Sequence, residues 1–351
     1  MPTKKSIRKR PLSFARLVPT IASRLRPPFG IALGSPGDTA ELAHCLPEGE
    51  TTCWQLDQFQ ADRLSEALRL RGRDAKIAVT PDLWDLDGAF QTLLYPVAFG
   101  GERALKLDVI EQAFHALKPQ GSLVLFTPYD HDHFFAPALK KIFGKVHLPM
   151  EGDNAIFWCQ RNGDRPRRRH EMAYHVRVDE ATSYAFTSRP GVFGYGFFDE
   201  GGRALTEVME LSPGQRVLDL GCGVGTNGII AARQIGANGS VAFADSNVRA
   251  IALAELNAKA MGVEKAEFSA TCTLDEWPDR SFDVVLANPP YYAQGTITHH
   301  FVARSHALLR PGGRFYLVTK QVDLAIEMMR EFFPEPEMFE NRGYIIFVAE
   351  R

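Results

Sequence analysis

The 351-residue sequence has no acidic residue before Asp38, although eight lysines and arginines fall in the same stretch. Its five cysteines are scattered and odd in number, without the spacing of zinc ligands. Because of this cysteine pattern we expect neither a disulfide framework nor a zinc site. The pattern also favours a reducing compartment, the cytoplasm. No apolar run approaches the roughly 20 residues that cross a bilayer, so we expect no membrane association.

Positive charge is concentrated in two places. Residues 1–28 form a basic arm that we expect to be flexible and to suit nucleic-acid phosphates. A solvated tail explains the same composition, and an organellar transit peptide is a weaker alternative. Arg167, Arg168 and Arg169 form a second cluster within residues 162–175, which contain proline and glycine and are predicted to be a linker. An RNA backbone lying on this cluster and a merely solvated linker are equally compatible with the pattern.

The chain is long enough for two domains, and an apolar content of 45% with 23% charged residues is typical of a globular protein. Strands alternate with helices in both halves, which predicts mostly parallel α/β sheets. Residues 116–126 resemble residues 308–318 in the placing of proline, glycine and apolar side chains, and 155–161 resemble 345–351. We therefore predict two tandem Rossmann-like domains, 29–161 and 176–351, the second with seven strands and a closing antiparallel hairpin.

The first copy lacks the features that carry chemistry in the second. It has no Gly-x-Gly-x-Gly turn after its first strand and no Asn-Pro-Pro-Tyr sequence, and Gly34-Ser-Pro-Gly37 is too short and too common a turn to replace them. We interpret it as a degenerate, non-catalytic domain. Whether it positions a substrate or only supports the second domain stays open.

Residues 217–225 form an apolar strand that opens into a glycine-rich loop before a helix. Glycines at 221, 223 and 225 allow close approach of a ligand to a helix N-terminus. Asp245, twenty residues after the loop, ends the next strand and suits the ribose hydroxyls of a nucleotide-like cofactor. Asp219 would repel a pyrophosphate and attract the amino end of a methionine moiety. The two acids together favour S-adenosylmethionine over a dinucleotide.

Residues 283–291 end a second buried strand in Asn288-Pro289-Pro290-Tyr291. The Asn288 amide oxygen and the Pro289 carbonyl can accept hydrogen bonds, while Tyr291 offers an aromatic face. Such a group suits a planar substrate with an exocyclic amine. Two acceptors favour the tetrahedral geometry that a conjugated nitrogen needs in order to attack a methyl group, so no strong base is required.

With these motifs in this order, and with Ser188-Arg-Pro-Gly-Val-Phe193 and Phe198-Asp-Glu-Gly-Gly202 before the glycine loop, the second half resembles class I S-adenosylmethionine-dependent methyltransferases. The degenerate copy in front narrows the resemblance to the ribosomal RNA guanine-N2 methyltransferases of the small- and large-subunit types. The resemblance implies that Asn288 and Pro289 hold the guanine amine and that Tyr291 stacks on the base. It also implies that Phe193 and Asp199 belong to a segment over the cofactor.

The resemblance has one departure that matters. The family often has Phe and then His after Asn-Pro-Pro, where this sequence has Tyr291 and Tyr292. Tyr291 keeps the stacking face, but the motif also serves adenine-N6 and glutamine-amide methylation, which are therefore alternatives to guanine-N2 methylation. A non-catalytic RNA-binding or ribosome-assembly protein is the remaining alternative.

The candidate residues fall into three groups. The expected catalytic residues are Asn288, Pro289, Pro290 and Tyr291. The expected cofactor-binding residues are Asp219, Gly221, Cys222, Gly223, Gly225, Asp245, Ser246 and Cys272. The expected substrate-binding residues are Phe193, Arg167, Arg168 and Arg169. No metal is expected, the predicted partner is ribosomal RNA or a ribosomal subunit, and the protein is expected to be a monomer.

Overall fold

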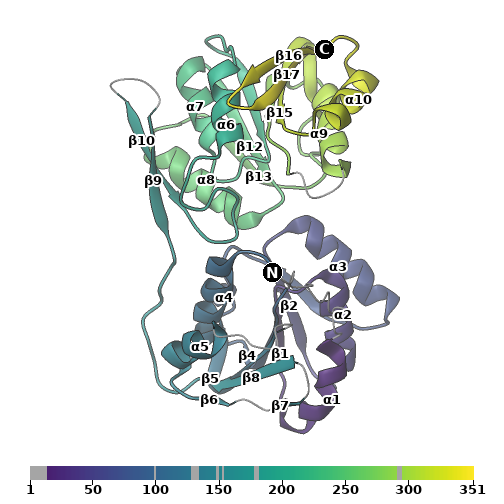
Figure 1. Cartoon of the computed structure of the whole chain (residues 1–351), viewed down its shortest axis with the longest axis vertical. Coiled ribbons are helices and arrows are strands. Elements are labelled where there is room, and N and C mark those ends of the chain that lie inside the picture. The colour runs from purple at the N-terminus through teal and green to yellow at the C-terminus, as the bar shows by residue number, and fades with distance from the viewer. Residues whose placement is uncertain are drawn as a thin grey trace, which may run out of the picture. The chain divides into compact units, whose positions relative to one another are not determined.

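The computed structural model describes residues 14–98, 100–127, 134–147, 150–151, 154–177, 182–290 and 295–351. It divides into two compact units, Met1–Arg169 and His170–Arg351. In each unit a central sheet is covered by helices on both faces (Figure 1). The division between the units falls inside the segment that the sequence predicts to be a linker.

The first unit is built on a mostly parallel sheet in the order β3-β2-β1-β4-β5-β8-β6, with β7 paired to β8. The strands are β1 (Phe29–Ala32), β2 (Thr51–Gln55), β3 (Lys76–Val79), β4 (Phe90–Pro96), β5 (Leu117–Thr127), β6 (Val146–His147), β7 (Met150–Glu151) and β8 (Asn154–Gln160). The helices are α2 (Pro36–Cys45), α3 (Gln58–Leu70), α4 (Arg103–Ala116) and α5 (Phe135–Phe143), with a 3-10 turn η3 (Leu83–Leu86). Every residue of β1 and β2 is buried, as expected for central parallel strands.

The N-terminal segment differs from the flexible arm that the sequence predicts. Residues 14–24 form the short helices η1 (Phe14–Leu17), α1 (Val18–Ile21) and η2 (Ala22–Arg24). The side chains of Phe14, Val18, Ile21 and Leu25 are buried and pack with β1, α2 and α3 in one core cluster. The prediction of a flexible arm is therefore wrong from residue 14 onward, because these apolar residues cover one face of the sheet. The most basic part of the arm lies outside the described residues.

The second unit begins with an antiparallel ribbon of β9 (Met172–Arg177) and β10 (Ser183–Ser188). Its sheet has the order β13-β12-β11-β14-β15-β17-β16. The strands are β11 (Arg216–Leu220), β12 (Ser240–Asp245), β13 (Ala266–Ala270), β14 (Phe282–Ala287), β15 (Leu309–Thr319), β16 (Glu337–Asn341) and β17 (Tyr344–Glu350). The helices are α6 (Glu200–Val208), α7 (Thr226–Ile235), α8 (Val248–Ala260), α9 (Thr296–Leu308) and α10 (Val322–Phe332).

The two sheets share their topology, which confirms the predicted tandem Rossmann-like fold. The order β3-β2-β1-β4-β5-β8 matches β13-β12-β11-β14-β15-β17, and the last strand of each pairs antiparallel. Even an irregularity is repeated. The register of β4 on β5 shifts between Phe90 and Thr92, and that of β14 on β15 shifts between Phe282 and Val284. The closing hairpin β16–β17 is also present as predicted.

Candidate active site

The glycine-rich loop connects β11 to α7 and has a backbone that only glycine adopts without strain. Gly221, Gly223 and Gly225 have φ angles of 72°, 55° and 85°. The N–H groups of Gly221 and Cys222 both donate to the Ala244 carbonyl at the end of β12, at 2.8 and 3.0 Å. The loop is thus fixed to the neighbouring strand and lies at the carboxyl edge of the sheet.

Asp219 lies beneath this loop rather than facing solvent. Its side chain is only 2% exposed, and its Oδ2 accepts a 2.7 Å hydrogen bond from the Gly228 N–H in the first turn of α7. Burial raises the pKa of Asp219 to about 7, and the nearby charge of Asp245 adds to the effect, while the bond from Gly228 opposes it. Asp219, which the sequence assigns to the methionine end of a cofactor, therefore also stabilises the first turn of α7.

Asp245 holds the middle of the loop. Its Oδ2 accepts from the Gly223 N–H and its Oδ1 from the Asn247 N–H, both at 2.9 Å. The next residue, Ser246, precedes α8. The Asp245 carbonyl accepts from the Thr271 N–H at 2.9 Å, which brings the segment after β13, with Cys272, to the same edge. The glycine loop, Asp245, Ser246 and Cys272 are therefore gathered at neighbouring strand ends, as the sequence predicts for this group.

Strand β14 delivers Asn288 beside the glycine loop. Ala287, the last residue of β14, pairs with Leu220, the last residue of β11, so Asn288 and Gly221 leave adjacent parallel strands at the same level. Asn288 and Pro290 are half-buried and Pro289 is buried. Tyr291, predicted to stack on a base, lies outside the described residues. This pair of strand ends is where ligands bind in open α/β sheets.

The side chain of Asn288 has a partner that the sequence did not suggest. Its Nδ2 donates to Oδ2 of Asp199 at 2.9 Å, and the same oxygen accepts from the Gly202 N–H at 2.9 Å, which makes Asp199 the N-cap of α6. A Cβ placed on Gly201 would lie 3.0 Å from Tyr344 Cε1 and 3.4 Å from Asn288 Oδ1. The Lys320 ammonium lies 4.2 Å from the centre of the Tyr344 ring. A cation and an aromatic ring thus stand at the same edge.

The segment between β10 and α6 reaches the glycine loop. Asn247 Nδ2 donates to the Gly191 carbonyl at 2.7 Å, and the buried Arg249 side chain donates to the Pro190 carbonyl at 2.5 Å. A Cβ on Gly223 would have the Phe193 carbonyl as its nearest neighbour, at 3.8 Å. The Phe193 ring itself is 69% exposed. Phe193 therefore flanks the loop with its ring available for contact.

The arginine cluster lies against the first unit. Arg167 pairs with Asp87 at 3.0 Å and Arg169 with Asp82 at 3.4 Å, and both guanidinium groups lie within 6 Å of the Trp84 ring centre, at 5.6 and 5.8 Å. Arg168 is exposed. Arg167 and Arg169 are exposed as well, so these contacts tie the predicted linker to Asp82, Asp87 and Trp84 at the surface.

Within the described ranges no three His, Cys, Asp or Glu side chains are grouped so that they could hold a metal ion. No helix in the described part of the chain is long and apolar enough to cross a membrane.

The family model of the methyltransferase small domain matches residues 183–348. Ribosomal RNA small subunit methyltransferase C of Chromohalobacter salexigens is 33% identical over 171 residues, which are 46% of this chain and 46% of that protein. Ribosomal RNA large subunit methyltransferase G of Klebsiella pneumoniae is 25% identical over 264 residues, covering 70% and 68% of the two chains. The chain thus spans about half the length of the small-subunit relatives that it matches.

Among solved structures, a 16S rRNA N2 methyltransferase of T. thermophilus, determined in complex with AdoMet and guanosine, has a TM-score of 0.75. It is 22% identical to this chain, and the match covers 95% of this chain and 92% of that one. At this identity the likeness establishes the shared tandem fold. Residues 183–348, which match the methyltransferase small domain model, contain the glycine loop, both acids and Asn288.

Proposed function

We propose that this protein transfers a methyl group from S-adenosylmethionine to the exocyclic N2 amine of a guanine in ribosomal RNA. The observation that carries the proposal is the pairing of Ala287 with Leu220, because it sets two amine acceptors, Asn288 and Pro289, beside a glycine loop suited to a cofactor. The names of the small- and large-subunit relatives support ribosomal RNA as the substrate. The proposed substrate implies that the protein works in the cytoplasm, and we propose that it acts as a monomer.

The residues of the second unit fit S-adenosylmethionine. Gly221 and Gly225 are closely packed against neighbouring side chains. A Cβ on Gly221 would lie 3.2 Å from Phe301, and one on Gly225 would lie 3.1 Å from Ala254. At Gly223, in the middle of the loop, the nearest atom to an added Cβ is the Phe193 carbonyl oxygen at 3.8 Å, so the loop is less tightly packed there. The loop would hold the methionine portion, and Asp245 would accept from the ribose hydroxyls, since a carboxylate accommodates several donors. Ser246, Cys222 and Cys272 would line the same site.

The protein would act as a positioner. When bound, the cofactor supplies an electrophilic methyl group on a sulfonium centre. Asn288 Oδ1 and the Pro289 carbonyl would accept the two hydrogens of the guanine amine and draw its nitrogen toward tetrahedral geometry, so that the lone pair points at the methyl group. Tyr291 and Phe193 would hold the plane of the base by stacking, while Pro290 ends the strand. As the nitrogen bonds to the methyl carbon, the carbon–sulfur bond would break with its electron pair going to sulfur, which leaves a neutral thioether, and the surplus proton on nitrogen would leave to solvent.

The test is label transfer from radiolabelled S-adenosylmethionine to unmodified ribosomal RNA, both naked and assembled in subunits, followed by nucleoside analysis. We expect N2-methylguanosine. N6-methyladenosine would keep the positioning chemistry but replace the base. No transfer to any form of RNA, despite measurable cofactor binding, would overturn the proposed substrate class and direct the search to protein amides.

A further inference from the structure

An asparagine that holds an amine must present the correct end of its amide. The oxygen and the NH2 group have nearly the same size, but only the oxygen accepts a hydrogen bond. If the amide of Asn288 were rotated by half a turn, its NH2 group would face the amine of the substrate, and two donors would oppose each other. The proposed role of Asn288 therefore requires something that fixes its orientation.

Asp199 supplies such a constraint. Asn288 Nδ2 donates to Asp199 Oδ2 at 2.9 Å, and an ionised carboxylate can only accept. Rotating the amide would bring the Asn288 oxygen against the carboxylate oxygen, exchanging a charge-assisted hydrogen bond for a repulsion between two acceptors. With Nδ2 occupied by Asp199, Oδ1 is the end that remains for a ligand.

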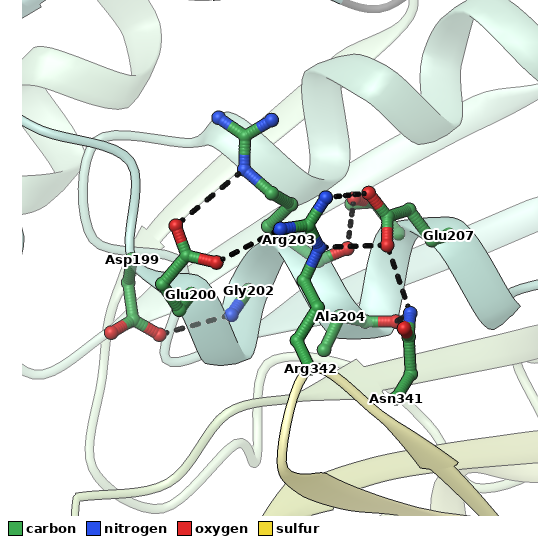
Figure 2. A network of polar contacts seen from close by, with 9 residues as sticks. Asp199, Glu200, Gly202, Arg203, Ala204, Glu207, Asn341 and Arg342 are labelled. Atoms are coloured by element: carbon green, nitrogen blue, oxygen red, sulfur yellow. Dashed lines mark hydrogen bonds and ion pairs between the residues drawn. The ribbon is translucent and has the colours of Figure 1, made fainter.

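Asp199 is itself held in place from two sides. Its Oδ2 caps α6 through the Gly202 N–H, and α6 is tied to the turn of the β16–β17 hairpin, as Figure 2 shows. Arg342 reaches from that turn to Glu200 at 3.2 Å and to Glu207 at 2.8 Å. The hairpin continues through β17 and β15 to β14, the strand that carries Asn288. Both partners of the contact are thus attached to one sheet.

Gly201 provides an independent indication that this contact is built into the fold. Its φ angle is not among the positive ones, so the backbone does not require glycine there. Glycine in a first helical turn is instead unfavourable, by about 1 kcal/mol relative to alanine. A Cβ at this position, however, would lie 2.9 Å from Asp199 Oδ2, 3.0 Å from Tyr344 Cε1 and 3.4 Å from Asn288 Oδ1. The missing side chain leaves room for the Asp199 carboxylate and the Tyr344 ring where they meet Asn288.

We propose that Asp199 is a positioning residue that fixes the Asn288 amide with Oδ1 toward the substrate amine. This inference rests on the proposed function, since it takes Asn288 to hold that amine. According to this inference, the contact between Asp199 and Asn288 contributes to substrate selection. A substrate is accepted when it offers hydrogen-bond donors to Asn288, as an exocyclic amine does, and not when it offers an acceptor.

The decisive variant is Asp199→Ser, because serine caps helices about as well as aspartate but is too short to reach Asn288. We expect kcat with guanine-containing RNA to fall roughly tenfold to a hundredfold, the range for losing a hydrogen bond to a charged group, while KM for the cofactor stays within about twofold. Asp199→Asn keeps an acceptor oxygen for both Gly202 and Asn288 and should restore most of kcat. Asp57→Ser, which removes an aspartate N-cap of the same kind from α3 in the other unit, is the matched control and should leave activity unchanged.

A second readout does not depend on activity. In protein labelled with ¹⁵N-asparagine, the Asn288 side-chain amide, assigned by its absence from Asn288→Ala, should show one proton shifted by its bond to the carboxylate. That shift should disappear in Asp199→Ser and persist in Asp57→Ser. An unchanged Asn288 resonance, or wild-type kcat in a folded Asp199→Ser protein, would overturn the inference. A wild type that binds cofactor but methylates no RNA would refute the proposed function instead, and the resonance would still decide whether Asp199 orients the amide.

Discussion

Asn288 is the residue whose removal separates chemistry from cofactor binding. Its side-chain amide donates to Asp199 of α6, and its proposed role is toward the substrate amine, so Asn288→Ala should reduce methyl transfer by at least about a hundredfold, as losing an electrostatic contact to the reacting group typically does. Cofactor affinity, measured by titration calorimetry, should change little. Asn162→Ala, at an exposed asparagine of the first unit, is the control. An equal loss of transfer and cofactor binding would mean that Asn288 has a structural role.

Asp219 makes stability depend on pH in an unusual direction. Its pKa in the folded protein is raised to about 7, so the folded state holds a proton that the unfolded chain releases near pH 4. Stability from this group is complete below the unfolded pKa and is lost as pH rises from about 4 to about 7. Asp219→Asn should therefore gain stability relative to wild type, by on the order of 2 kcal/mol between pH 5 and pH 8.

This prediction is checked by urea unfolding of the cofactor-free protein at several pH values. A difference between wild type and Asp219→Asn that stays constant from pH 5 to pH 8 would show that Asp219 is ionised throughout, with an ordinary pKa. The sequence places Asp219 correctly at the end of a strand, but it gives no sign of its burial. That burial comes from packing against α7, which brings Gly228 to the carboxylate.

At the scale of elements, the apolar strands that end in glycine or proline were predictable, because these residues mark the end of a strand in the local sequence. The β9–β10 ribbon was not predicted, since its stability depends on distant contacts such as the bond between Tyr174 and Thr226 at 2.9 Å. The helices of residues 14–24 were hidden by the surrounding basic residues. The contact between Asp199 and Asn288 joins positions 89 residues apart and leaves no local pattern in the sequence.

The close packing of the glycine loop on α8 gives a prediction about these elements. Gly225 and Gly262 both have positive φ angles, 85° and 71°, so alanine at either position is strained by roughly 1–2 kcal/mol. Only at Gly225 would the added Cβ also press on a neighbour, 3.1 Å from Ala254, whereas Gly262 has nothing within 4 Å. Gly225→Ala should lower thermal stability further than Gly262→Ala and weaken cofactor binding, which Gly262→Ala should not. Equal melting temperatures of the two variants would contradict the packing role of Gly225, and equal cofactor affinities would contradict its place in the cofactor site.

On the scale of the whole molecule, the repeated topology shows that a fold can be kept while its site is lost. Both sheets have the same strand order, yet the first unit continues from β1 into Leu33 and Gly34 without a glycine-rich loop. Strand β4 ends at Pro96 and is followed by Val97, whereas β14 is followed by Asn288. Fold class and the repeat could be read from sequence because they depend on patterns of apolar residues. What the first unit contributes to substrate binding depends on its surface, which such patterns do not describe.

The arginine cluster provides the test of that contribution. All three arginines are exposed, but Arg167 and Arg169 pair with Asp87 and Asp82, which partly neutralises the charges of these two. If RNA lies on this surface, Arg168→Gln should weaken binding and reduce the slope of log affinity against log salt by about 0.7 to 0.9, the effect of one phosphate contact. Arg167→Gln should reduce the salt slope less, because Arg167 is already paired with a carboxylate and therefore contributes less to binding a phosphate.

Arg280→Gln, at an exposed residue just before β14 and therefore opposite the carboxyl edge, is the control. A salt slope unchanged in Arg168→Gln, and unchanged again when Arg167 and Arg169 are also replaced, would remove the cluster from the RNA-binding surface and leave it the structural role that its ion pairs and its contacts with Trp84 already describe.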